Sequence, residues 1–382
     1  VAYRDGGNSA YGTARVGTVS GTSITFGSKS VFESGTAQYI TPIYDSSNQK
    51  VVIAYRDQGN SYYGTAVVGE VSGTSITFGS PVVFESANTS NISAIFDSTN
   101  GKVVITYRDY PNSNSGTAIV GTVSGTSISF GSAVVFSSSP TYNISSAFDS
   151  TNGKVVIAYQ DNGNSAYGTA IVGTVSGTSI SFGSAVVFES AQPEYNAVVY
   201  DPTNGKVVIA YQDTGNSNYG TAIVGTVSGT SISFGTAVVF RSGRANYITA
   251  VYDSNSERIV ISYQDNSNSL GLGTVVSGTV SGTSISFGTT VVYNPGNTQP
   301  PSVVYDSANG KSVIVYRDHD NSGYGTAVVF SPRTISRNLT AENFIGISDA
   351  SYTNGQTATI QLTGAVDDAQ SSLTPGQSYY VQ

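Results

Sequence analysis

The sequence has 382 residues, and 24 acidic residues against 16 Lys and Arg give a formal net charge of −8 at pH 7. Cys, Met and Trp are absent, and His319 is the only histidine. Disulfides, zinc–thiolate sites and iron–sulfur clusters all need Cys and are excluded. The acidic charge disfavours a nucleic acid partner, and no run of about 18 apolar residues exists, so no membrane insertion is expected.

A long repeat dominates the chain. The motif Tyr-x-Asp recurs at intervals of 52 residues, and of 53 at the last step. Its aspartates are Asp5, Asp57, Asp109, Asp161, Asp213, Asp265 and Asp318. The stretch at 168–188 returns with few changes at 116–136 and 220–240. Such self-similarity is the signature of a repeat architecture in which each unit is one supersecondary element.

Each unit is predicted to hold four short strands. In the unit around Asp161 they span 143–148, 155–160, 168–175 and 179–188. The turn before the second strand contains Gly153, which is free to take the positive φ of a tight hairpin. About eight irregular residues are expected to link one unit to the next. No helical period appears, and Val, Ile, Thr, Tyr and Phe fill the runs, which favours strands.

The fold prediction follows from the second strand, whose Val-Val-Ile run is apolar on both faces and must be covered on both sides. Four-stranded sheets stacked face to face achieve this. We therefore predict an all-β fold, a seven-bladed β-propeller of four-stranded antiparallel blades over 1–330, with a small C-terminal β module at 331–382. A stacked β-solenoid is the alternative.

The two ends of the repeat array are incomplete. Val1 starts inside the second strand of its unit, which suggests a processed or truncated start, and the last unit stops after its third strand at 324–330. The segment 343–349 resembles a first strand and is predicted to pair with 1–5 and close the ring. Further strands are expected at 357–362 and 378–382.

The repeated aspartates are predicted to be structural, because an Asp side chain accepts hydrogen bonds from amides two or three residues on and fixes a turn. Their loop resembles the Asp-box turn of sialidase-like propellers. The alternative is a calcium site with Asp161, Asn162, Asn164 and Ser165 as oxygen donors, but one carboxylate per loop is a poor calcium ligand set. We expect no cofactor and no metal.

No catalytic residue is predicted. Glycoside hydrolysis needs two carboxylates about 5–10 Å apart, and no such pair stands out. His319 lies alone in a loop and is expected to be solvated. The tyrosine two residues before each repeated Asp is predicted to pack between blades, with stacking on a base or sugar as the alternative. These tyrosines are Tyr3, Tyr55, Tyr107, Tyr159, Tyr211, Tyr263 and Tyr316.

The copies differ on one face, which holds the links between units and the loops after the repeated Asp. The residue before that Asp is Arg in four units and Gln in three (Gln160, Gln212 and Gln264). Varied loops on a rigid scaffold are where binding residues usually lie, although drift on a solvated rim explains the variation equally well. The predicted ligand-binding residues are Arg4, Arg56, Arg108, Arg317, Tyr39, Tyr195, Arg241, Arg244 and Tyr247.

The sequence of the repeat resembles propeller repeats in virion and tail proteins of marine bacteriophages. The segment 338–382, which begins NLTAENFIGISD, resembles a C-terminal module of the same proteins. The resemblance implies a non-enzymatic virion or extracellular protein that contacts a host-surface glycan or protein and other virion or surface proteins, with homo-oligomers possible. A bacterial secreted or surface adhesin is the first alternative, and a carbohydrate-active enzyme the second.

Overall fold

The computed structural model describes residues 1–267, 269–332, 347–348 and 360–361. The chain separates into two compact units, Val1–Pro332 and Arg333–Gln382. In the second unit, β31 (Ile347–Ser348) pairs antiparallel with β32 (Ile360–Gln361). The rest of the predicted ring-closing segment 343–349, and the predicted strand at 378–382, lie outside the described residues.

Within Val1–Pro332 the repeat forms antiparallel strands. The described residues contain no α-helix. From here on, a unit is one copy of the repeat. The second strands of the units, which carry the Tyr-x-Asp motif, are β1 (Ala2–Asp5), β6 (Lys50–Asp57), β10 (Lys102–Asp109), β15 (Lys154–Asp161), β20 (Lys206–Asp213), β24 (Arg258–Asp265) and β29 (Lys311–Asp318). Each pairs with the third strand that follows it: β2 (Tyr11–Ala14), β7 (Tyr63–Ser72), β11 (Ser115–Ser124), β16 (Tyr167–Ser176), β21 (Tyr219–Ser228), β25 (Leu272–Ser281) or β30 (Tyr324–Phe330).

The predicted fourth strand is divided in two. In the unit around Asp161, the expected strand 179–188 forms β17 (Ser179–Phe182) and β18 (Val186–Glu189), and both pair with β16. Between the two pairings, residues 183–185 lie opposite only residues 171–172 of β16. One extra residue on one of two paired strands is a β-bulge. The short outer strands equivalent to β17 are β4 (Ser23–Phe26), β8 (Ser75–Phe78), β12 (Ser127–Phe130), β22 (Ser231–Phe234) and β26 (Ser284–Phe287). In the first unit β4 pairs with β3 (Gly17–Ser20).

The expectation of an irregular link between units is wrong at three places. There the outer part of one sheet continues into the first strand of the next as one strand of 16 residues: β5 (Ser30–Asp45), β9 (Val82–Asp97) and β23 (Val238–Asp253). In β5, Val31 pairs with Thr13 of β2 and Ala37 pairs with Asp57 of β6. The link is extended because its backbone groups find partners on both neighbouring sheets.

The other links contain a short break between two strands. These pairs are β13 (Val134–Ser137) with β14 (Thr141–Asp149), β18 with β19 (Pro193–Asp201), and β27 (Val291–Asn297) with β28 (Ser302–Asp306). We call the segment between two sheets a junction, whether broken or not.

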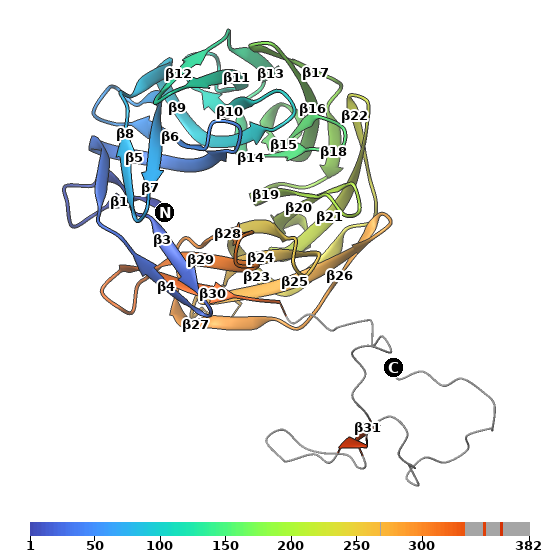
Figure 1. The fold of residues 1–382 in the computed structure, drawn as a ribbon. Helices are drawn as coiled ribbons and strands as arrows, with labels where there is room; N and C mark the ends of the chain where they lie inside the picture. The colour runs from blue at the N-terminus through green and yellow to red at the C-terminus, as the bar shows by residue number, and fades with distance from the viewer. Residues whose placement is uncertain (268, 333–346, 349–359, 362–382) are drawn as a thin grey trace. The chain divides into compact units, whose positions relative to one another are not determined.

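The sheets follow one another around a ring (Figure 1). First strands of neighbouring units contact each other, and each short outer strand from β12 onward contacts the third strand of a neighbouring unit. The same kind of contact joins β4 in the first unit to β30 in the last, so the two ends of the repeat array meet. The all-β propeller class is thereby confirmed. The last sheet has three strands, β28, β29 and β30, and the count of seven complete blades stays a prediction.

Aromatic contacts hold neighbouring sheets together, as predicted for the tyrosine row. The Tyr211 ring lies 5.3 Å from the ring of Phe188, which ends the preceding sheet, and its hydroxyl donates to Glu189. The same contact recurs as Tyr55 with Phe32, Tyr107 with Phe84, Tyr159 with Phe136, Tyr263 with Phe240, and Tyr316 with Tyr293. Tyr3 is half-buried and makes no aromatic ring contact within the described part of the chain.

A second set of aspartates, which the sequence analysis did not single out, organises the turn before each second strand. Asp149 Oδ1 accepts hydrogen bonds from the amides of Thr151 (3.1 Å) and Asn152 (3.0 Å), and its Oδ2 accepts one from Asn152 Nδ2 (2.7 Å). Gly153 completes the turn with φ 62°, as predicted. The buried carboxylate therefore replaces the partners that the turn amides would otherwise take from water.

Replacing Tyr211 by Ala removes a fully buried ring between two sheets, and we expect a loss of about 3–5 kcal/mol in the free energy of unfolding. Tyr3→Ala removes the equivalent residue where no ring packs against it, and should cost much less. Urea denaturation of both variants measures the difference. Equal losses would contradict the role given to the Tyr–Phe contact.

Burial raises the pKa of Glu85 and of Glu189, which accept hydrogen bonds from Tyr107 and Tyr211. A raised folded-state pKa stabilises the fold below the unfolded value near 4.5, and this contribution is lost as pH rises through the folded pKa. Gln keeps an acceptor oxygen but does not titrate. We therefore expect wild type to lose stability relative to the Glu85→Gln/Glu189→Gln variant as pH rises from 4 toward neutrality.

The measurement is the difference in thermal midpoint between wild type and this double variant across that pH range. Glu257→Gln serves as the control for loss of charge, because Glu257 is an exposed turn residue and Gln49 stands in an equivalent turn with a similar φ. A difference that does not change with pH would refute the assignment to Glu85 and Glu189.

Candidate ligand-binding site

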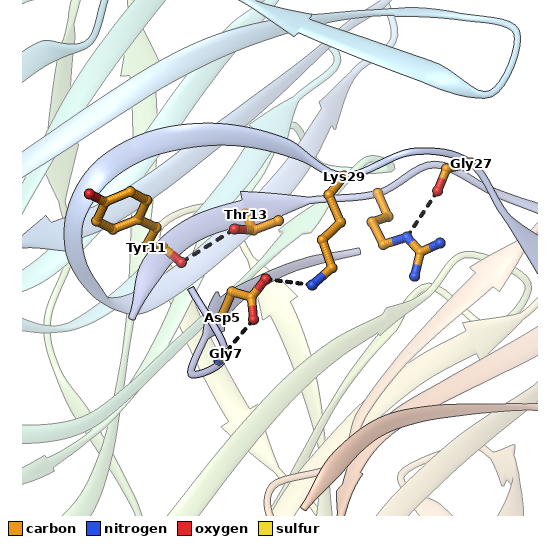
Figure 2. Close-up of polar contacts among 7 residues, drawn as sticks. Asp5, Gly7, Tyr11, Thr13, Gly27 and Lys29 are labelled. Atoms are coloured by element: carbon orange, nitrogen blue, oxygen red, sulfur yellow. Dashed lines mark hydrogen bonds and ion pairs between the residues drawn. The ribbon is translucent and has the colours of Figure 1, made fainter. Parts of the chain in front are cut away.

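The repeated aspartates act within their own loops. Asp161 Oδ1 accepts from the Gly163 amide at 2.9 Å, and equivalent bonds to loop amides are made by Asp5, Asp57, Asp213 and Asp265. Figure 2 shows Asp5 bound to both the Gly7 amide and Lys29, whose Nζ lies 2.7 Å from Asp5 Oδ2. At these five positions the Asp side chain therefore binds an amide two or three residues further along its own loop.

The calcium alternative gains no support. Within the described residues, no three or more His, Cys, Asp or Glu side chains form a group that could hold a metal ion. His319 is half-buried, and its amide donates to the Asn297 carbonyl.

The residues directly before the repeated Asp, which are Arg in four units and Gln in three, are called the Arg/Gln row. This row lies on the faces of the sheets opposite the Tyr–Phe contacts, because successive side chains of a strand point to opposite sides. Tyr55 packs on Phe32 of the preceding sheet, whereas Arg56 Nη1 donates to the Thr89 carbonyl of the following junction (3.3 Å). Gln212 makes the equivalent bond to the Ala245 carbonyl (2.7 Å). These two row residues therefore face the next junction.

Five of the six described junctions carry a bulge against the second strand that follows them, and β28 pairs with β29 without one. In β5 the register with β6 breaks between Gln38 and Thr41, and Tyr39 has a left-handed φ of 49°. The equivalent residues, all with φ between 49° and 54°, are Asn91, Asn143, Tyr195 and Tyr247. This backbone region is strained for an aromatic residue, and such strain is concentrated at functional sites. The sequence analysis identified the tyrosines but not their backbone conformation.

The first of these bulges borders a pocket. Arg4, Ala37, Gln38, Tyr39, Ile40 and Arg56 line a cavity of about 410 Å³. The Arg56 guanidinium lies over the Tyr39 ring, 4.9 Å from its centroid, and over Tyr62 at 5.1 Å, and its Nη2 donates to Gln38. Arg4 is exposed and, among the described residues, makes no hydrogen bond or ion pair through its side chain. We call this the Arg4–Arg56 pocket.

A second cluster joins three other predicted residues. The rings of Tyr195 and Tyr247 lie with centroids 4.9 Å apart. Burial raises the pKa of Tyr195, Tyr247 adds to the rise, and the nearby Arg244 opposes it. Arg244 is exposed, and its Nε donates to Asn246 Oδ1 at 3.1 Å. Two predicted tyrosines and one predicted arginine therefore share one area.

The remaining predicted residues lie apart from these two groups. Arg108 is 9% exposed, stacks on Tyr110 and Tyr142, and donates to Asn114 Oδ1 and Tyr142 Oη. Arg241 forms an ion pair with Asp265 at 2.9 Å. Arg317 is exposed in the last unit. The first two are thus used to join loops and junctions of the chain itself.

The site also contains residues that the sequence analysis missed. Gln38 and Tyr62 contact Arg56, and Tyr110 and Tyr142 contact Arg108. The available signal was the extra tyrosine in the affected loops, since Tyr62 stands directly before the repeated Tyr63.

The structure is similar to several solved β-propellers. A lectin from Burkholderia pseudomallei, BP39L, matches with a TM-score of 0.61 at 10% identity over 85% of this chain and 89% of that protein. An intramolecular trans-sialidase from Ruminococcus gnavus matches with a TM-score of 0.52 at 9% identity over 79% and 95%. No protein-family model matches the sequence, and no curated protein matches it. At these identities the likeness establishes the fold.

Among the described residues, no helix is long and apolar enough to cross a membrane.

Tyr39→Asn should leave the free energy of unfolding within about 1 kcal/mol of wild type, because Asn tolerates a left-handed φ and already occupies this position at Asn91 and Asn143. Tyr39→Val places a β-branched side chain at that φ and should cost about 1–3 kcal/mol. Tyr44→Val, at an exposed position of the same strand with ordinary φ, is the control. Thermal unfolding distinguishes the three, and a harmless Tyr39→Val would disprove the strain.

Proposed function

We propose that this chain is a non-enzymatic propeller that binds glycans on the face formed by the junction bulges and the Arg/Gln row. The observation that carries the proposal is the placement of the bulge tyrosines. Tyr39 is 45% exposed although it sits at a strained φ beside a guanidinium. An exposed ring offers an apolar face to a sugar, and the neighbouring Arg and Gln offer hydrogen-bond donors to its hydroxyls.

The fold likeness to a lectin supports binding, and the likeness to a trans-sialidase raises the enzyme as the competing function. Binding is favoured by the lining of the Arg4–Arg56 pocket, which contains no Asp or Glu. Most glycoside hydrolases place two carboxylates across the bond, and sialidases, which use a tyrosine nucleophile, are an exception. The lining residues therefore supply recognition groups without an acid and base pair.

The protein is further proposed to act on a virion, as a structural or receptor-binding part of a phage tail that contacts a host-surface glycan. Weak contacts of this kind gain strength when several sites act together. Copurification with capsid and tail proteins in a particle preparation tests the placement. A protein found only in the secreted or cell-surface fraction of a bacterium would favour an adhesin instead.

A glycan array probed with wild type and with the Tyr39→Asn/Tyr247→Asn variant tests binding. Loss of both rings should weaken binding to the best glycan at least tenfold, about 1.4 kcal/mol, while the fold stays intact. Tyr44→Asn, which removes an exposed tyrosine away from the bulges, should bind as wild type does. An unchanged affinity in the double variant would remove the bulge tyrosines from the site, and turnover of a glycan on the array would favour the enzyme.

A further inference from the structure

We infer that the Arg4–Arg56 pocket recognises the negatively charged group of an acidic sugar, a carboxylate or a sulfate ester. The inference rests on the proposed glycan binding and names the class of sugar. It is carried by two guanidinium groups that line one cavity with no acidic side chain in the lining.

The charge of the pocket is not neutralised by nearby acids. Asp5 follows Arg4 on β1 and is paired with Lys29 at 2.7 Å, and Asp57 follows Arg56 on β6 and accepts from the Asn60 amide. Alternation along each strand directs these carboxylates to the side opposite the arginines. Guanidinium groups stay protonated at any physiological pH. A positive pocket is therefore maintained on a protein whose net charge is −8.

Among the described residues, Arg4 differs from Arg56, Arg108 and Gln212 in that its side chain makes no hydrogen bond. Arg56 donates to the Thr89 carbonyl, Gln212 donates to the Ala245 carbonyl, and Arg108 donates to Asn114 and Tyr142. Within the described part of the chain, the Arg4 side chain makes no such bond, although the equivalent junction residue, Ala37, also lines the pocket. Five N–H donors in a planar fork are thus left for a ligand, in the geometry that binds a carboxylate or sulfate through two oxygens.

The rest of the pocket fits a sugar that carries such a group. The pocket is a shallow hollow of about 410 Å³ that is open to solvent, so it leaves room for a sugar at its surface. The Tyr39 ring is exposed on one part of its surface and covered by the Arg56 guanidinium on another. Arg56 therefore serves both to hold the ring and to add a second positive charge near the acidic group.

The chain itself supplies the test variants. Gln occupies the Arg4 and Arg56 position in three units, so Arg4→Gln and Arg56→Gln reproduce a residue that the repeat already accommodates. Arg258→Gln makes the same change of charge outside the pocket lining, at the end of β24 opposite to the row residue Gln264. Thermal unfolding checks that all three variants remain folded.

The probes are glucuronic acid with glucose, and galactose-6-sulfate with galactose, titrated calorimetrically into wild type and the variants. We expect wild type to prefer an acidic sugar over its neutral partner at least tenfold. Arg4→Gln and Arg56→Gln should each remove most of this preference, and Arg258→Gln should keep it. A preference for glucuronic acid that disappears below about pH 3, where a carboxylate becomes protonated, identifies a carboxylate ligand, whereas a preference for the sulfated sugar that persists identifies sulfate.

Equal binding of acidic and neutral sugars, or a preference that survives both pocket substitutions, would overturn the inference while leaving glycan binding in place. The absence of any binding to these four probes, together with an acidic-glycan signal on the array that Arg4→Gln leaves unchanged, would also overturn it. No binding to any sugar on the array would instead remove the proposed function itself.

Discussion

The packing of a buried tyrosine on a phenylalanine of the preceding sheet is the contact on which this fold depends. Each sheet is too small to bury its own faces, since the Val-Val-Ile run of a second strand is apolar on both sides and its neighbouring residues, such as Val155 and Val156, are fully buried. The Tyr–Phe contact recurs at five gaps between sheets, and Tyr316 packs on Tyr293 at a sixth. The hydroxyl group then reaches a glutamate in three of the junctions, which gives the aromatic contact a fixed orientation.

The same strands that lock the sheets together also build the candidate site. Tyr55 and Arg56 are neighbours in sequence, yet one faces the preceding sheet and the other the following junction. The rigidity of the first contact therefore fixes the position of the second residue. A guanidinium held in this way is pre-organised, because little of its freedom remains to be lost when a ligand binds.

The junctions give each part of the ring its own chemistry without changing the scaffold. At the first junction Arg4, whose side chain makes no hydrogen bond within the described residues, lines a pocket with an exposed tyrosine, and at Tyr195 two tyrosine rings pack against each other at a tilt. At the third, Arg108 is enclosed by Tyr110 and Tyr142 and has become part of the packing. Because each junction is paired to two sheets through its backbone, its side chains vary at small cost to the fold.

The sequence alone determined the repeat, the first three strands of its unit, the Gly153 turn and the inter-sheet role of the tyrosines, because these depend on local patterns that recur along the chain. It did not reveal that the link is a continuous strand in β5, β9 and β23, since that depends on partners in two sheets. Nor did it show the left-handed φ of Tyr39, which follows from a register break against β6. Arg4 and Arg56 are equivalent residues of successive repeats, and only the stacking of sheets decides that they line one pocket while Arg108 is buried elsewhere.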